Sequence, residues 1–262
     1  MQLTVYVMTH KPYDQLKKYL DYSYVFMQLG SAINPRISGY LSDDYKTDSI
    51  SFKNPYYSEL TGLYNIYKQR TDRYVGLIHY RRFFSGKKFS IFSYKALQRR
   101  QIEKYLLSYD IILPKKTRFK TSLYENYKHN HYIKDIEETR KVIESLYPNY
   151  VDSFDHHMKG KKAYIANMFI GKKEIIDRYA KWLFDILFEL EKRVDISSYD
   201  SYQKRIYGFI SERLFNVWLD NQVLRIKEIP IVTTELPPFK EFLKDCYRSV
   251  FGVSGISNTK KR

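Results

Sequence analysis

The residues best suited to chemistry in this sequence are cationic groups that follow short apolar runs. The sharpest set comes straight after the run 74–78 and consists of His79, Tyr80, Arg81 and Arg82. Because the planar guanidinium fork of arginine matches phosphate oxygens in pairs, the adjacent arginines predict contact with a phosphorylated ligand. Strand alternation would direct Arg81 and Arg82 to opposite sides. The structural alternative is an ion pair with a carboxylate such as Glu59.

Polar and cationic residues follow other apolar runs in the same way. They are Thr9, His10 and Lys11 after 3–8, Lys115 and Lys116 after 109–113, and Asn167, Lys172 and Lys173 within or after 163–170. In open α/β sheets, ligands bind beyond the carboxyl ends of the strands. As neighbouring parallel strands, the four runs would form one pocket suited to a pyrophosphate. The alternative is solvated loop charge in a very basic protein.

A framework of strands and helices must hold these residues in place. Apolar patterning predicts strands at 3–8, 74–78, 109–113, 163–170 and within 223–232, and helices at 57–69, 94–107, 135–146, 175–190 and 202–219. Residues 13–53 show no clear period, and 115–134 read as a loop with a short helix. Strands that alternate with helices indicate an α/β domain with a mostly parallel sheet flanked by helices.

Composition narrows the classes of protein that fit this chain. The 262 residues carry a formal charge of +16 and include 27 tyrosines. Such a charge attracts nucleic acid, anionic lipid or a phosphorylated small molecule. No helix-turn-helix, zinc-finger or RNA-recognition motif accompanies it, so we expect no nucleic-acid partner. A basic nucleic-acid-binding protein and a non-catalytic membrane-surface protein nevertheless stay as alternatives.

Two further features bear on localisation. No window approaches 18 consecutive apolar residues, and the run 3–8 begins without the features of a signal peptide. A single cysteine, Cys246, excludes an internal disulfide framework and a cysteine-rich zinc site. We therefore expect a cytoplasmic protein, with peripheral attachment to the inner face of the membrane as an option.

Several separate motifs resemble the bacterial glycosyltransferases of capsular-polysaccharide synthesis, a family formerly described as a domain of unknown function. The similar segments run in the expected order from about Val5 to Val232 and are 57–64, 76–84, 167–170, 182–187 and 207–214. The resemblance implies a GT-A-like fold over 1–235, with a nucleotide-sugar half at about 1–115 and an acceptor half at about 116–235. It also implies a UDP-sugar donor, often galactose in its pyranose or furanose form, and a glycan or lipid-linked glycan acceptor.

One departure from the GT-A pattern concerns the metal. GT-A enzymes place an Asp-x-Asp pair after the corresponding strand, where it holds a divalent cation against the donor pyrophosphate. Here that place reads His79-Tyr80-Arg81. Cationic side chains can stabilise a leaving diphosphate directly, so we expect no metal ligands, although Mn²⁺ or Mg²⁺ held by His79 and a distant carboxylate is the alternative.

An inverting transferase needs a carboxylate or histidine near the acceptor hydroxyl as its catalytic base. Glu212 is the first candidate, because it lies opposite an apolar helical stripe and one turn after Gly208. A solvated glutamate would give the same pattern. Glu59 is the second candidate, while Asp110 fits a local hydrogen-bond acceptor. The pair His156-His157 is expected to lie on the surface.

The C-terminal residues 236–262 predict a basic amphipathic extension. Apolar residues at helical spacing form one stripe, namely Phe239, Phe242, Leu243, Cys246, Tyr247, Val250 and Phe251. Residues 239–262 hold six Lys or Arg and two acidic residues, a net charge of +4. This segment is suited to an anionic membrane surface, or the stripe packs on the catalytic domain.

Overall fold

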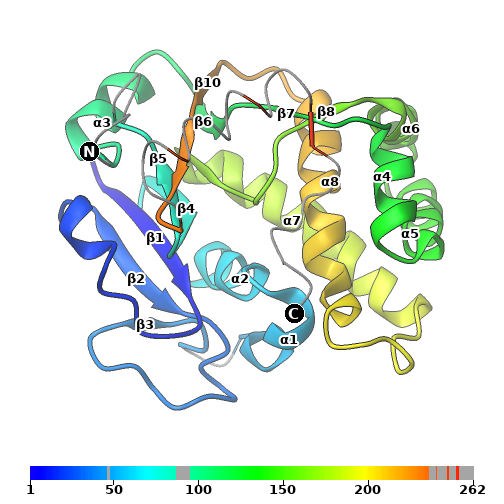
Figure 1. The fold of residues 1–262 in the computed structure, drawn as a ribbon, viewed down its shortest axis with the longest axis horizontal. Helices are drawn as coiled ribbons and strands as arrows, with labels where there is room; N and C mark the ends of the chain where they lie inside the picture. Colours follow the sequence, from blue (N-terminus) through cyan, green and yellow to red (C-terminus); the bar gives the residue numbers. More distant parts are fainter. Residues whose placement is uncertain (46–47, 87–94, 236–239, 241–246, 248–251, 254–262) are drawn as a thin grey trace.

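A computed structural model describes residues 1–45, 48–86, 95–235, 240, 247 and 252–253. Its centre is a nine-stranded sheet whose main path runs β10-β6-β9-β4-β1-β2-β3, with β5 pairing to β4 and β11 (Figure 1). The strands of this sheet are β1 (Leu3–Thr9), β2 (Tyr24–Gln28), β3 (Leu41–Ser42), β4 (Tyr74–His79), β5 (Arg82–Phe84), β6 (Ile111–Pro114), β9 (Phe169–Lys172), β10 (Ile226–Ile229) and β11 (Ile231–Thr233). A separate pair joins β7 (Thr117–Arg118) and β8 (Lys162–Ala163).

Helices follow or separate these strands. They are α1 (Asn54–Tyr57), α2 (Leu60–Gln69), α3 (Arg99–Leu106), α4 (Leu123–Asn130), α5 (Ile133–Leu146), α6 (Val151–Lys159), α7 (Lys173–Arg193) and α8 (Ile206–Asp220). Short 3-10 helices cover Lys17–Tyr19, Ser51–Lys53, Pro148–Tyr150 and Gln203–Arg205. In the part of the chain that the structure describes, no helix combines the length and apolar character needed to span a bilayer.

Alternation along the strands assigns the helices to two faces of the sheet. On β1, Val5 and Val7 join the core cluster that contains Ile102 of α3, while Tyr6 and Met8 join the cluster of α2, α7 and α8. Side chains two apart in a strand point to the same face, so β1 is buried on both sides. The predicted α/β fold, with a mostly parallel sheet between helices, is confirmed.

Strand direction explains what meets at each edge of the sheet. Parallel pairing sets Met8 of β1 opposite His79 of β4, so these two strands end together. By contrast, β9 runs antiparallel to both of its neighbours, β4 and β6. The edge that receives the carboxyl ends of β1 and β4 therefore receives the amino end of β9.

The structure corrects several predicted elements. The stretch 13–53 contains the buried parallel strand β2, which is only five residues long and carries no helical or alternating signature. The helix predicted over 57–69 is divided at Ser58, whose positive φ of 50° breaks the helical path. Helix α6 was not predicted. Most of the extension predicted at 236–262 lies outside the described residues.

Candidate functional site

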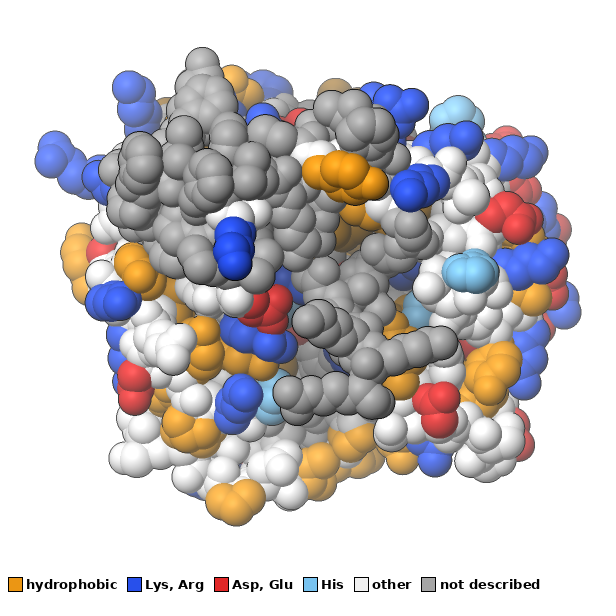
Figure 2. Space-filling model, viewed as in Figure 1, with side chains coloured by type: hydrophobic (Ala, Val, Ile, Leu, Met, Phe, Trp, Pro, Cys, Tyr) orange, Lys and Arg blue, Asp and Glu red, His pale blue; other side chains and the backbone are white. Residues whose placement is uncertain are grey.

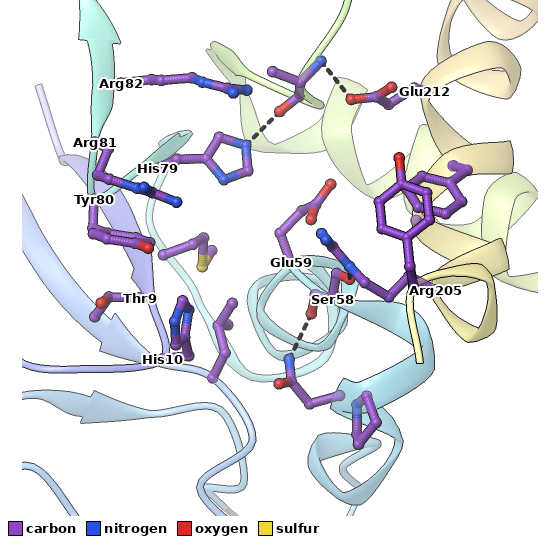
Figure 3. A pocket seen from close by; sticks show the side chains of 18 of the residues that line it. Thr9, His10, Ser58, Glu59, His79, Tyr80, Arg81, Arg82, Arg205 and Glu212 are labelled. Atoms are coloured by element: carbon purple, nitrogen blue, oxygen red, sulfur yellow. Dashed lines mark hydrogen bonds between the residues drawn. The ribbon is translucent and has the colours of Figure 1, made fainter. Parts of the chain in front are cut away.

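A cavity of about 530 Å³ opens beyond the carboxyl ends of β1 and β4. Helices α1 and α8, with Ser58 and Glu59 just before α2, contribute to the opposite wall (Figure 3). The lining includes eight of the predicted site residues, namely Thr9, His10, Glu59, His79, Tyr80, Arg81, Arg82 and Glu212. Residues on both sides of position 115 line it, so the cavity draws on both of the predicted halves. The roles of these residues stay predictions.

His79 is held at the last position of β4. Its Nε2 lies 2.5 Å from the carbonyl oxygen of Ala166, which accepts a hydrogen bond if Nε2 carries the proton. Burial lowers the pKa of His79, and the nearby Arg82 lowers it further, while the charge of Glu59 opposes both. The imidazole is therefore neutral near pH 7, and Nδ1 is left as its hydrogen-bond acceptor.

Arg81 lies in the turn between β4 and β5, Arg82 is the first residue of β5, and both point into the cavity (Figure 3). The prediction that alternation sends them to opposite sides is wrong, because β4 ends at His79 and the chain reverses there. Arg81 forms an ion pair with Glu235 and lies 4.9 Å from the centre of the Tyr80 ring. This is the predicted structural alternative of an ion pair between one arginine and a carboxylate, with Glu235 in the place of Glu59.

A further cation, Arg205, faces this turn from the opposite wall (Figure 3). Its Nε donates to Ser58 Oγ at 3.1 Å. Its charge contributes to the lowered pKa of both His10 and His79, where burial is the largest cause. Sequence reasoning missed Arg205, because it precedes a helix rather than following a strand.

Glu212 projects from α8 and is mostly buried, with 12% of its side chain exposed. Its Oε1 accepts the Ala166 backbone N–H at 2.9 Å, and Oε2 lies 3.5 Å from Nη1 of Arg213. Burial raises the pKa of Glu212, against the lowering effect of Arg213. The alternative of a solvated glutamate is therefore wrong. A Cβ added at Gly208 would lie 3.5 Å from Ser58, which is an ordinary van der Waals distance.

Glu59 lies between the two walls, just before α2 (Figure 3). Its Oε1 accepts from Nδ2 of Asn167 at 2.7 Å, and the same amide donates to Ser211 Oγ at 2.8 Å. Asn167 thus lies behind the lining as a support for Glu59. Gly62 lets α2 approach β1 closely, because a Cβ there would come within 2.4 Å of Met8 Sδ.

Backbone strain concentrates beside this cavity. Among the described residues other than glycine, positive φ angles occur at Ser58 (50°), Ala166 (72°) and Asn167 (48°). Residues held in such conformations cluster at functional sites, because only surrounding contacts can maintain them. The backbone carbonyl of Ala166 bonds to His79 and its N–H bonds to Glu212, so this strained segment fixes a predicted donor-binding side chain and a predicted base at once.

Aromatic rings form another part of the lining. Phe209 of α8 stacks on His131 with ring centres 4.1 Å apart and lies 5.1 Å from the ring of Tyr202. All three rings are half-buried and line the cavity. Burial lowers the pKa of His131 to about 4, so its ring is uncharged near pH 7. This aromatic wall, His131, Tyr202 and Phe209, was not among the predicted site residues.

Other predicted cations lie elsewhere. Lys172 binds Asp110 at 2.9 Å and Lys173 binds Asp177 at 2.7 Å, because β9 is antiparallel and its carboxyl end lies at the opposite edge. Lys115 and Lys116 do not line the cavity, since β9 separates β6 from β4. Lys11 lies beside the lining, 5.9 Å from the Tyr80 ring centre.

The remaining candidates have structural surroundings. Asp110 accepts hydrogen bonds from Lys172 and Arg225, as predicted for a local acceptor. The expected surface pair is wrong for His157, which is buried on α6, whereas His156 is exposed. Within the described ranges, no group of three or more His, Cys, Asp and Glu residues is placed to hold a metal ion.

Comparison with known proteins gives a family and a structural relative. Residues 4–223 match the family described as Domain of unknown function (DUF4422). The solved apo structure of the WbbM bifunctional glycosyltransferase is similar with a TM-score of 0.80 and 29% sequence identity, over 90% of this chain and 46% of that chain. This chain thus spans less than half the length of that relative. No curated protein matches the sequence.

Proposed function

We propose that this chain, which belongs to the DUF4422 family, is a glycosyltransferase that moves a sugar from a nucleotide-sugar donor to a glycan or lipid-linked glycan. The likeness to one part of a bifunctional glycosyltransferase supports the transferase class. One observation carries the proposal at the site. A single cavity places the cationic side chains of Arg81, Arg82 and Arg205 around the carboxylates of Glu59 and Glu212.

The cations suit the leaving group of sugar transfer. As the bond between the anomeric carbon and the donor phosphate breaks, its electron pair and the developing negative charge go to the diphosphate. Preorganised guanidinium groups in a partly enclosed site stabilise such charge without reorganisation. Arg82 at the start of β5 and Arg205 on the opposite wall line the cavity from two sides (Figure 3).

A carboxylate then completes the exchange of bonds. The acceptor hydroxyl oxygen forms the new bond to the anomeric carbon, and its proton passes to a base. In our proposal Glu212 is that base, since its raised pKa brings it nearer to the working pH. Glu59 is the second candidate, because it lies in the middle of the cavity. Either residue must be ionised before the acceptor reacts.

The donor within this proposal is a UDP-sugar, with galactose as the first sugar to test, in the pyranose and furanose forms. A GT-A-like arrangement and a role in bacterial surface-polysaccharide synthesis are parts of the same proposal. Arginines take the place that a metal has in Asp-x-Asp enzymes. Transfer should therefore continue in EDTA; complete loss that Mn²⁺ or Mg²⁺ restores would instead assign a cation to His79 and a carboxylate.

The alternative class is a nucleic-acid-binding protein. Figure 2 shows the described Lys and Arg side chains spread over one face, with acidic side chains among them, rather than gathered in a stripe. Binding to a nucleic-acid backbone needs continuous positive charge along the phosphates. The distribution therefore favours a small phosphorylated ligand.

Thermal shift separates these classes in one experiment. A ligand that binds only the folded state stabilises it by RT ln(1 + [L]/Kd). We expect UDP, UDP-galactose and UDP-galactofuranose to raise the melting temperature, and duplex DNA to have no effect at 150 mM salt. Release of UDP from a donor, with and without added galactosides, then tests turnover. A shift with DNA alone, weakened strongly by salt, would overturn the proposal.

A further inference from the structure

The aromatic wall of the cavity differs in chemistry from the cationic wall beside it. His131 is the C-terminal cap of α4, Tyr202 precedes the 3-10 turn 203–205, and Phe209 lies on the second turn of α8. Their mutual ring distances are 4.1, 5.1 and 5.9 Å. Three half-buried rings from separate elements thus form one apolar surface inside a strongly charged pocket.

The hydrogen bonds around Gln203 fix the proton on His131. The Gln203 side chain donates from Nε2 to the carbonyl of Asn130 at 2.9 Å, so its Oε1 is an acceptor. That oxygen lies 3.0 Å from Nδ1 of His131, which must therefore carry the proton. With the pKa of His131 lowered to about 4, Nε2 keeps its lone pair at neutral pH and accepts a hydrogen bond.

This combination matches a sugar ring. One face of a hexopyranose presents C–H groups that pack on a flat aromatic ring, and its edge presents hydroxyl donors. The wall supplies both the rings and one acceptor nitrogen. A diphosphate needs neither the rings nor the acceptor nitrogen. It suits Arg81 and Arg82 after β4 together with Arg205, whose guanidinium lies 5.6 Å from the centre of the Phe209 ring. The rings and the cations therefore suit different ligands, which meet beside Arg205.

We propose that His131, Tyr202 and Phe209 form the subsite that binds the terminal sugar ring of the acceptor. This inference rests on the proposed glycosyltransferase function and assigns the acceptor side of the same cavity. The sugar ring packs on the aromatic wall, and one of its hydroxyls donates to His131 Nε2. Glu59 and Glu212 lie in the same cavity, where one of them takes the proton of the reacting hydroxyl.

Saturation-transfer NMR tests this subsite, with UDP and an octyl glycoside in one sample. The probes are octyl β-galactoside, octyl β-glucoside and octyl β-mannoside. With the wild-type protein we expect transfer to the ring C–H protons of at least one glycoside and to UDP. Tyr202→Leu and Phe209→Leu keep apolar volume but remove a ring, and each should reduce the glycoside signal at least fivefold while the UDP signal persists. Tyr202→Phe keeps the ring and should retain the glycoside signal.

A matched control distinguishes the subsite from a general effect on folding. Tyr132 neighbours His131, is 45% exposed and does not line the cavity, so Tyr132→Leu should leave both signals unchanged. Absence of every glycoside signal while UDP binds, or glycoside signals that survive both leucine variants, would overturn the subsite alone. Failure of UDP to bind the wild-type protein would instead overturn the proposed function.

Discussion

At the scale of single residues, the two arginines after β4 differ in their surroundings. Arg81 is already paired with Glu235, whereas Arg82 lies close enough to the half-buried His79 to lower the pKa of that imidazole. An anionic ligand must compete with Glu235 for Arg81. Arg82 is therefore the arginine on which we expect turnover to depend most.

We predict that Arg82→Ala lowers kcat on the order of 10²-fold or more, because a lost charge-stabilising contact costs roughly 3–4 kcal/mol. Arg81→Ala should also lower it. Arg82→Lys keeps the charge but loses the planar fork, so it should recover only part of the rate. Steady-state UDP release measures all three. Arg225→Ala, which breaks an ion pair with Asp110 outside the cavity, is the control. Near-native turnover in both alanine variants would make the arginines structural.

A second residue-scale prediction concerns the base. The raised pKa of Glu212 should place the acidic limb of the kcat profile above 4.5, the ordinary value for glutamate, because a base must be ionised and activity falls as pH drops through its pKa. Glu212→Gln keeps an acceptor for the Ala166 N–H, so we expect a large loss of turnover with little change in UDP affinity. Normal turnover in this variant would transfer the role to Glu59.

At the scale of elements, the segment before β9 stores strain to hold the site. We predict that Ala166→Gly is neutral or stabilising, because glycine avoids a left-handed penalty of about 1–2 kcal/mol. The control Ala163→Gly, at another buried alanine, should destabilise by about 0.5–1 kcal/mol. Urea unfolding measures both. Equal destabilisation would show that the φ of 72° at Ala166 carries no strain.

The elements also show what sequence patterning can supply. Long amphipathic helices such as α7 and the buried runs of β1 and β4 were predicted within a few residues, and their ends located the cationic turn. The sequence could not predict that β9 runs antiparallel to its neighbours, because the apolar pattern of a strand does not depend on the direction of its pairing. Arg205 and the aromatic wall were missed for a related reason: only tertiary packing brings α4 and α8 to the ends of β1 and β4.

At the scale of the whole molecule, the described part of the C-terminal segment returns to the domain. Val253 pairs with Phe119, donating its backbone N–H to the carbonyl of Arg118 and accepting from the N–H of Lys120. Deleting the whole segment would therefore remove this pairing with the domain as well as the charge. The membrane hypothesis is better tested through charge, at Lys260, Lys261 and Arg262.

We predict that changing these three residues to glutamine weakens binding to anionic vesicles by roughly 10²-fold, since each cation near such a surface contributes about 1 kcal/mol. Vesicle sedimentation at low and high salt measures it. The control changes the exposed Lys141, Lys181 and Lys192 to glutamine, which removes equal charge from α5 and α7. Equal loss in both triple variants would indicate attraction by net charge alone.

The hydrogen bonds that hold the cavity together also have a consequence for how the protein folds. The hydrogen bonds that assemble the cavity join residues 46, 87, 108 and 147 positions apart, from Ala166–Glu212 to Ser58–Arg205. The loop-closure entropy of such contacts rises with sequence separation, and folds rich in non-local contacts form slowly. No fragment that ends before α8 contains a complete site. During synthesis, the cavity can therefore close only after Glu212 has left the ribosome, and residues 1–115 by themselves lack part of its lining.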